Sequence, residues 1–174
     1  MISLGHTYAK LGEFDESKSH YTQAITVLKL CYGDYTDVGK CWLKIADVYL
    51  KEKCENHALR CYEQSVVILR SIEACDDYAW SVYQGLGKCL LRLKRHQEAI
   101  TCLNKALALA RKGKDGERIA DSQLMTALAQ FHTGEEEQAL ENSEEAINFK
   151  LPALDVENAH FVFSAIDMTL IVCK

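Results

Sequence analysis

The sequence predicts an all-α protein made of four repeated helix hairpins and one further C-terminal helix. Three observations predict this architecture. A pattern of side chains recurs every 40 or 41 residues, apolar residues within each copy are spaced by three, four and seven, and small residues occupy the same places in every copy. Such spacings put the apolar side chains on one face of a helix. Each copy therefore supplies two helices separated by a break.

The four copies span approximately residues 1–34, 39–75, 80–114 and 118–150. The breaks between their two helices are expected, in order, at Leu11-Gly12, Lys53-Cys54, Leu93-Lys94 and Thr133-Gly134. The fourth copy is degenerate, because Ser143 stands where the others have Tyr21, Tyr62 and Leu103. A last apolar stretch, residues 154–173, is expected to form a capping helix or the first half of a fifth hairpin.

Each copy has three small positions, and Gly, Ala or Ser fills all of them. Small side chains where helices cross allow the two backbones to approach closely. We therefore predict that these residues pack the repeats together. They are Gly5, Ser17, Ala24, Ala46, Ala58, Ser65, Gly87, Ala99, Ala106, Ala127, Ala139 and Ala146.

This pattern resembles the tetratricopeptide repeat (TPR), which has an aromatic residue, Leu-Gly and Tyr in its first helix and Ala, an aromatic residue and Ala in its second. The second copy shows it as Trp42, Ile45-Ala46, Tyr49, Ala58, Tyr62 and Ser65. The usual repeat has 34 residues. The longer form here, with the stretch CYGDYTDVGKCWLKIADVYL, is similar to the repeats of kinesin light chains. The resemblance implies a right-handed α-α superhelix, or TPR solenoid, whose first helices line a concave face.

We expect a single TPR domain over residues 1–174, because one Pro and nine Gly leave no room for a flexible linker. No signal peptide and no run of about 18 apolar residues is present, so we expect a cytoplasmic protein without membrane contact. The first helix begins abruptly and the last has no partner. Three alternatives stay open: a fragment or short isoform, a final helix folded back as a cap, or apolar ends docked on another subunit.

The sequence carries no nucleophile elbow, phosphate-binding glycine loop or H-E-x-x-H motif. We therefore expect neither enzymatic activity nor a cofactor. The eight cysteines include no C-x-x-C pair, which fits reduced thiols in an intracellular protein. Cys54, His57 and Cys61 have the spacing of metal ligands on one helix face, but the local sequence offers no fourth ligand, so we expect no metal site.

Charge is distributed unevenly along the chain, whose formal net charge is −5. Residues 38–114 carry 14 basic and 8 acidic side chains, whereas residues 115–157 carry 2 basic and 11 acidic ones. Charges on a solenoid commonly keep its exposed faces soluble. Several of the basic residues, however, recur at first-helix positions that the resemblance places on the concave face.

The resemblance therefore predicts a basic groove that binds a peptide. Its residues are expected to be Lys10, Lys44, Asp47, Lys51, Gln84, Lys88, Arg92, Leu128 and Phe131. Together with exposed Leu50 and Leu91, the cations suit an extended peptide with acidic and apolar side chains. The carboxylate clamp that binds chaperone tails in other TPR proteins is not matched, since its positions hold Ile2, His6, Lys44, Ser81 and Gly85.

Two functional hypotheses follow. The first is a non-catalytic protein-interaction adaptor that binds a partner peptide in the concave groove. The second is a structural subunit held permanently in a cytoskeletal or ciliary assembly, docked or self-associated through residues 154–173. Nucleic acid is not an expected partner, because RNA-reading helical repeats need regular polar pairs and the groove residues here change from copy to copy.

Overall fold

The computed structural model describes residues 1–31, 35–71 and 76–150, and every element in these ranges is an α-helix. The prediction of an all-α chain of helix hairpins is confirmed. Its internal contacts group the chain into two compact units, Met1–Leu93 and Lys94–Lys174. The single domain over residues 1–174 stays a prediction.

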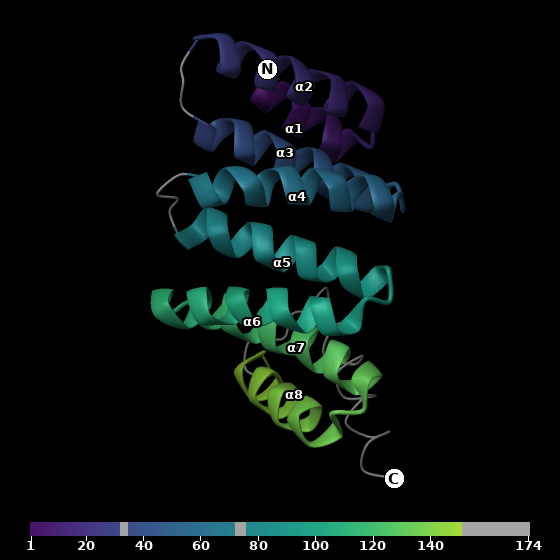
Figure 1. The fold of residues 1–174 in the computed structure, drawn as a ribbon, viewed down its shortest axis with the longest axis vertical. Helices are drawn as coiled ribbons and strands as arrows, with labels where there is room; N and C mark the ends of the chain where they lie inside the picture. The colour runs from purple at the N-terminus through teal and green to yellow at the C-terminus, as the bar shows by residue number, and fades with distance from the viewer. Residues whose placement is uncertain (32–34, 72–75, 151–174) are drawn as a thin grey trace. The chain divides into compact units, whose positions relative to one another are not determined.

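The first unit contains five helices in the part of the chain that the structure describes (Figure 1). They are α1 (Ile2–Leu11), α2 (Phe14–Cys31), α3 (Tyr35–Lys51), α4 (Glu55–Ser71) and α5 (Asp76–Arg92). Each helix packs on the next, and α3 also contacts both α1 and α5. The first helices of successive hairpins therefore lie next to one another, which a shared groove requires.

The second unit contains α6 (His96–Gly113), α7 (Gly116–Thr133) and α8 (Glu136–Lys150) among its described residues. Helix α7 packs against both α6 and α8. A small core joins Ala120 and Leu124 to Ala146, with Ile147 packed against it. The helix expected over residues 154–173 lies outside the described residues.

The structure has a turn at each of the four expected breaks. A residue with left-handed backbone stands at every one: Gly12 (φ 83°), Lys53 (φ 59°), Lys94 (φ 60°) and Gly134 (φ 81°). In three of the turns the following residue donates its N–H to the carbonyl five residues earlier, namely Glu13 to Tyr8, Cys54 to Tyr49 and Glu135 to Gln130. The carbonyls of Tyr8 and Gln130 also accept the N–H of Gly12 and Gly134, so the last turn of each of these helices ends on a shared acceptor.

All twelve small repeat positions are buried. A Cβ atom on Gly5 would lie 3.0 Å from the ring of Tyr21, so alanine would fit there only if the ring shifted slightly. Two of the positions are serines, and both donate to a glycine carbonyl on the facing helix: Ser17 Oγ to Gly5 O at 2.7 Å, and Ser65 Oγ to Gly39 O at 3.0 Å. The hydroxyl is thereby satisfied without added bulk.

The degenerate fourth hairpin buries polar side chains where the other copies bury apolar ones. Gln130 donates to Gln138 Oε1 at 3.2 Å and accepts a hydrogen bond from Asn142 Nδ2 at 2.8 Å. Ser143 is also buried, and its Oγ donates to the carbonyl of Ala139 at 2.7 Å. Because these side chains have hydrogen-bond partners, their burial does not carry the full cost of desolvation.

Candidate peptide-binding groove

A cavity of about 310 Å³ lies in the unit Met1–Leu93. Its walls come from α1, α3 and α5, and α2 and α4 each contribute one tyrosine. The residues that line it, called here the groove, are His6, Ala9, Lys10, Tyr21, Lys44, Asp47, Val48, Leu50, Lys51, Tyr62, Gly85, Lys88 and Arg92. The groove is therefore built mainly by the first helices of three successive hairpins.

Six of the nine residues predicted for peptide binding line this groove, namely Lys10, Lys44, Asp47, Lys51, Lys88 and Arg92. They meet because α3 contacts both neighbouring first helices and the repeat places equivalent residues on the same face. Gln84 is half-buried and lies outside the lining set. Leu128 and Phe131 are half-buried residues of the second unit. A binding role for any of the nine stays a prediction.

Three lysines of the groove come from different helices and are exposed: Lys10 on α1, Lys51 on α3 and Lys88 on α5. None of the three forms an ion pair within the described residues. A ligand would therefore not have to break an internal ion pair in order to bind these ammonium groups. An anionic ligand would meet three uncommitted cations in one groove.

Arg92 has a different role from the lysines, although it also lines the groove. Its Nη1 donates to the carbonyl oxygen of Leu50 at 2.6 Å. Leu50 is the penultimate residue of α3, and its carbonyl also accepts the backbone N–H of Lys53 at 3.3 Å. The guanidinium group of Arg92, on α5, thus donates a hydrogen bond to the C-terminal end of α3. From the sequence we expected Arg92 to be a free cation of the groove, and no sequence pattern indicated this hydrogen bond.

Asp47 is the single acidic residue among those that line the groove. Its Oδ1 accepts a hydrogen bond from the Tyr62 hydroxyl at 2.7 Å, and its Oδ2 lies 3.3 Å from Lys44 Nζ. Tyr62 is completely buried, and its ring lies against Gly85, where a Cβ atom would come within 2.6 Å of it. Burial, followed by the charge of Asp47, raises the pKa of Tyr62, so the hydroxyl remains a donor.

The prediction for the apolar residues of the groove is wrong in one respect. Leu50 was expected to be exposed beside the cations, but only 6% of it is exposed. Leu91 is half-buried and lies outside the lining set. Leu50 is buried because it belongs to the packed face of α3, where helices on both sides cover it. Leu50 nevertheless lines the groove.

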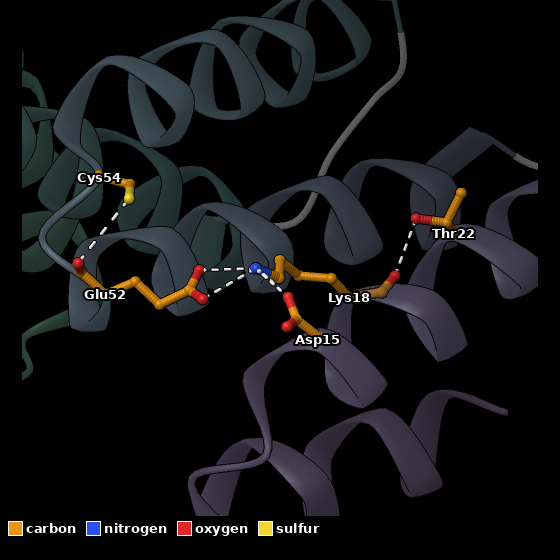
Figure 2. Close-up of polar contacts among 5 residues, drawn as sticks. All are labelled: Asp15, Lys18, Thr22, Glu52 and Cys54. Carbon is orange, nitrogen blue, oxygen red and sulfur yellow. Dashed lines mark hydrogen bonds and ion pairs between the residues drawn. The ribbon is translucent and has the colours of Figure 1, made fainter.

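Lys18, on α2, connects the first hairpin to the second (Figure 2). Its Nζ lies 2.8 Å from the Glu52 carboxylate and 2.9 Å from that of Asp15, and 4.8 Å from the centre of the Tyr49 ring. Burial lowers the pKa of Lys18, but the hydrogen bonds to Glu52 and Asp15 outweigh it, so the pKa is raised. The contact joins α2 to the turn that follows α3.

Two of the three residues considered as metal ligands, Cys61 and His57, lie in environments that do not resemble a metal site. Cys61 is buried, and burial raises the pKa of its thiol to about 11. The ring of His57 stacks on that of Tyr49, with centroids 5.3 Å apart. Within residues 1–31, 35–71 and 76–150, no three side chains of His, Cys, Asp or Glu come together as a metal site would require. In the same ranges, no helix has the length and apolar character needed to cross a membrane.

The repeats match a known family by sequence. Residues 1–27 and residues 77–151 each match a sequence profile described as tetratricopeptide repeat, and the two matches together span more than half of the chain. The chain belongs to the tetratricopeptide-repeat family. The resemblance drawn from the small and aromatic positions is thus confirmed, and the TPR chain presents a repeat scaffold of the kind that supports protein–protein interaction.

Two proteins of Arabidopsis thaliana are similar to this TPR chain. Protein KINESIN LIGHT CHAIN-RELATED 3 is 30% identical over 116 residues, which cover 62% of this chain and 17% of the relative. Protein KINESIN LIGHT CHAIN-RELATED 1 is 27% identical over 173 residues, which cover 92% of this chain and 27% of the relative. The TPR chain therefore spans less than a third of the length of either relative.

Solved structures show the same fold. Nearly identical TPR-like repeats from Podosopora anserina, assigned to a kinesin light chain, superpose with a TM-score of 0.76 at 17% identity, over 98% of this chain and 82% of theirs. A Rap protein in complex with Competence and Sporulation Factor gives a TM-score of 0.75 at 19% identity, over 97% of this chain and 49% of its own. At these identities the likeness concerns the fold alone.

Proposed function

We propose that this TPR protein is a non-catalytic adaptor that binds an acidic segment of a partner protein in its groove. The observation that carries the proposal is the convergence of Lys10, Lys51 and Lys88 on one cavity without ion-pair partners in the described part of the chain. Carboxylates of a ligand would pair with these cations, and the cavity between the helices would hold the ligand backbone.

The ligand is an extended segment rather than a compact surface. The three lysines stand on α1, α3 and α5, so one ligand must cross three helices to reach all of them. Leu50 lines the groove but is almost fully buried, so it offers a ligand little apolar surface. Binding in such a groove depends strongly on ionic strength, since salt screens exposed charges over about 10 Å at 0.1 M.

The likeness to proteins named kinesin light chain-related supports a cytoplasmic adaptor associated with the cytoskeleton. The alternative of a structural subunit depends on residues 154–173, which lie outside the described residues.

The test uses a fluorescent octapeptide of glutamate and glutamine, Ac-EEEQQEEE-NH2, in an anisotropy titration at low and at physiological salt. We expect saturable binding that weakens as salt rises. The double variant Lys51→Glu/Lys88→Glu should reduce affinity by about tenfold or more, because it reverses two of the three uncommitted charges.

A matched control is Lys29→Glu/Arg70→Glu. It changes the net charge equally at two exposed basic residues outside the groove. Thermal melting checks that both double variants fold. If the control loses as much affinity as the groove variant, binding follows net charge rather than the groove, and the proposal is wrong. Absence of any binding to the wild-type chain contradicts it as well.

A further inference from the structure

A carboxylate stands in the middle of a surface that otherwise offers cations. Asp47 lies between Lys44 and Lys51 on α3, three residues after the first and four before the second, so all three side chains share one helix face. Alone, this carboxylate would repel an acidic ligand. Attraction of an anionic ligand therefore does not explain why Asp47 lines the groove.

Two contacts hold the carboxylate in place. The buried hydroxyl of Tyr62 donates to Oδ1, and the ring of Tyr62 is fixed against Gly85 on α5. Lys44 reaches Oδ2 only at 3.3 Å, the long end of the hydrogen-bond range. The side chain of Asp47 is nevertheless 39% exposed. Oδ1 is therefore held firmly by the Tyr62 hydroxyl, whereas Oδ2 is bound only weakly by Lys44.

An ionised carboxylate has about four lone-pair positions, of which these two contacts use two. The remaining positions can accept hydrogen bonds from a ligand. Charged donors form the strongest bonds to a carboxylate, above all the planar guanidinium of arginine and the ammonium of lysine. A ligand with one basic residue at this point would also relieve the repulsion that Asp47 exerts on its acidic neighbours.

We propose that Asp47 determines the specificity of the groove by pairing with a Lys or Arg of the ligand. The preferred ligand is thus an acidic segment interrupted by one basic residue. That residue binds Asp47, and the flanking acidic residues bind the surrounding lysines, such as Lys51 and Lys88. This inference rests on the proposed function, since it assigns a sequence pattern to the ligand of the same groove.

The experiment compares two labelled octapeptides of equal length and net charge, Ac-EEEQQEEE-NH2 and Ac-EEEKEEEE-NH2. They differ in whether a cation stands among the glutamates. We expect the wild-type chain to bind the lysine peptide about three- to tenfold more tightly, the difference of one charge-assisted pair. In Asp47→Asn this preference should disappear, and the glutamine peptide should bind more tightly than it does to the wild type.

The chain offers a closely matched control. Asp37 also lies on α3 and also pairs with a lysine three residues away, Lys40, at 3.0 Å, but it lies outside the groove. Asp37→Asn therefore removes the same charge and the same type of ion pair. It should keep the preference for the lysine peptide. Asparagine can still accept the hydrogen bond from Tyr62, so Asp47→Asn is expected to fold as the wild type does.

The outcomes separate the two proposals. Equal binding of both peptides by the wild type overturns the role of Asp47 and leaves acidic-peptide binding standing. A preference that survives in Asp47→Asn, or that is lost equally in Asp37→Asn, has the same consequence. Failure of both peptides to bind the wild type overturns the proposed function and this inference together.

Discussion

The ammonium group of Lys18 lies 2.8 Å from the carboxylate of Glu52, and so connects the second helix of the first hairpin to the turn of the second. Both side chains are largely buried, with 17% and 21% of their surfaces exposed. Its partners are 34 residues apart in the sequence, so only packing brings them together.

Replacing Lys18 with Met should lower the free energy of unfolding by about 1–2 kcal/mol, since it leaves the partly buried carboxylate of Glu52 without its cation. Urea denaturation measures the change. The control is Lys40→Met, which breaks an ion pair whose side chains are about half exposed and should cost less than about 0.5 kcal/mol. Equal losses in the two variants would contradict a structural role for the Lys18 contact.

Gly85→Ala should destabilise the protein by about 1–3 kcal/mol, because the added Cβ would overlap the ring of Tyr62 and press it against its neighbours. Gly113→Ala is the matched control, since no atom lies within 4 Å of its added Cβ. There alanine should be neutral or stabilise the helix by up to about 1 kcal/mol. Thermal melting distinguishes them: a fall in Tm for Gly113→Ala, or none for Gly85→Ala, would contradict the packing described.

Stability should decrease as the pH falls below about 6.5, partly because of a histidine pair in the second unit. The rings of His96 and His132 stack with centroids 4.6 Å apart. Burial, then His132 and Lys94, lowers the pKa of His96 from its usual 6.5. The unfolded chain therefore binds more protons than the folded one at acidic pH. The stabilisation is complete above the unfolded pKa and is lost as pH falls through the folded pKa.

Urea unfolding at pH 7.5 and at pH 5.5 tests this histidine pair. His132→Phe should keep an aromatic ring against His96 while removing a charge at low pH, so it should lose less stability on acidification than the wild type. His6→Asn removes an exposed histidine of the first unit and should leave the wild-type difference nearly unchanged. An unaltered pH dependence in His132→Phe would show that the stacked pair is not responsible.

Two cysteines should differ strongly in their reactivity towards iodoacetamide. Cys54 is exposed in the turn between α3 and α4, whereas Cys41 is 1% exposed and burial raises its pKa to about 11. Only the thiolate reacts, so folding protects Cys41 in two ways. The reagent cannot reach the buried thiol, and its raised pKa keeps the thiol protonated. Peptide mass spectrometry should show fast labelling of Cys54 and slow labelling of Cys41. In guanidinium chloride the two rates should become similar; rapid labelling of Cys41 in the native protein would contradict its burial.

Local sequence patterns were sufficient to predict the helices, the turns between them and the burial of the small repeat residues. These features depend on local periodicity: apolar spacings along a helix, breaks such as Gly12 and Gly134, and small residues that recur in every copy. Lys10 and Lys51 occupy equivalent first-helix positions of the repeat, and Lys88 lies one helical turn before Arg92, the equivalent residue of the third copy. All three therefore fall on the same face of their helices, which is why their convergence could be predicted before the helices were seen together.

The contacts that the groove residues make depend on helix packing, which no local pattern predicts. Arg92 binds the carbonyl of Leu50, Leu50 is buried, and Tyr62 from a second helix holds Asp47. Each of these features involves side chains from different helices. Its geometry depends on how closely two helix faces pack. Hydrophobic periodicity fixes which face of a helix is buried, but the distance between side chains across that face is set only when the helices pack.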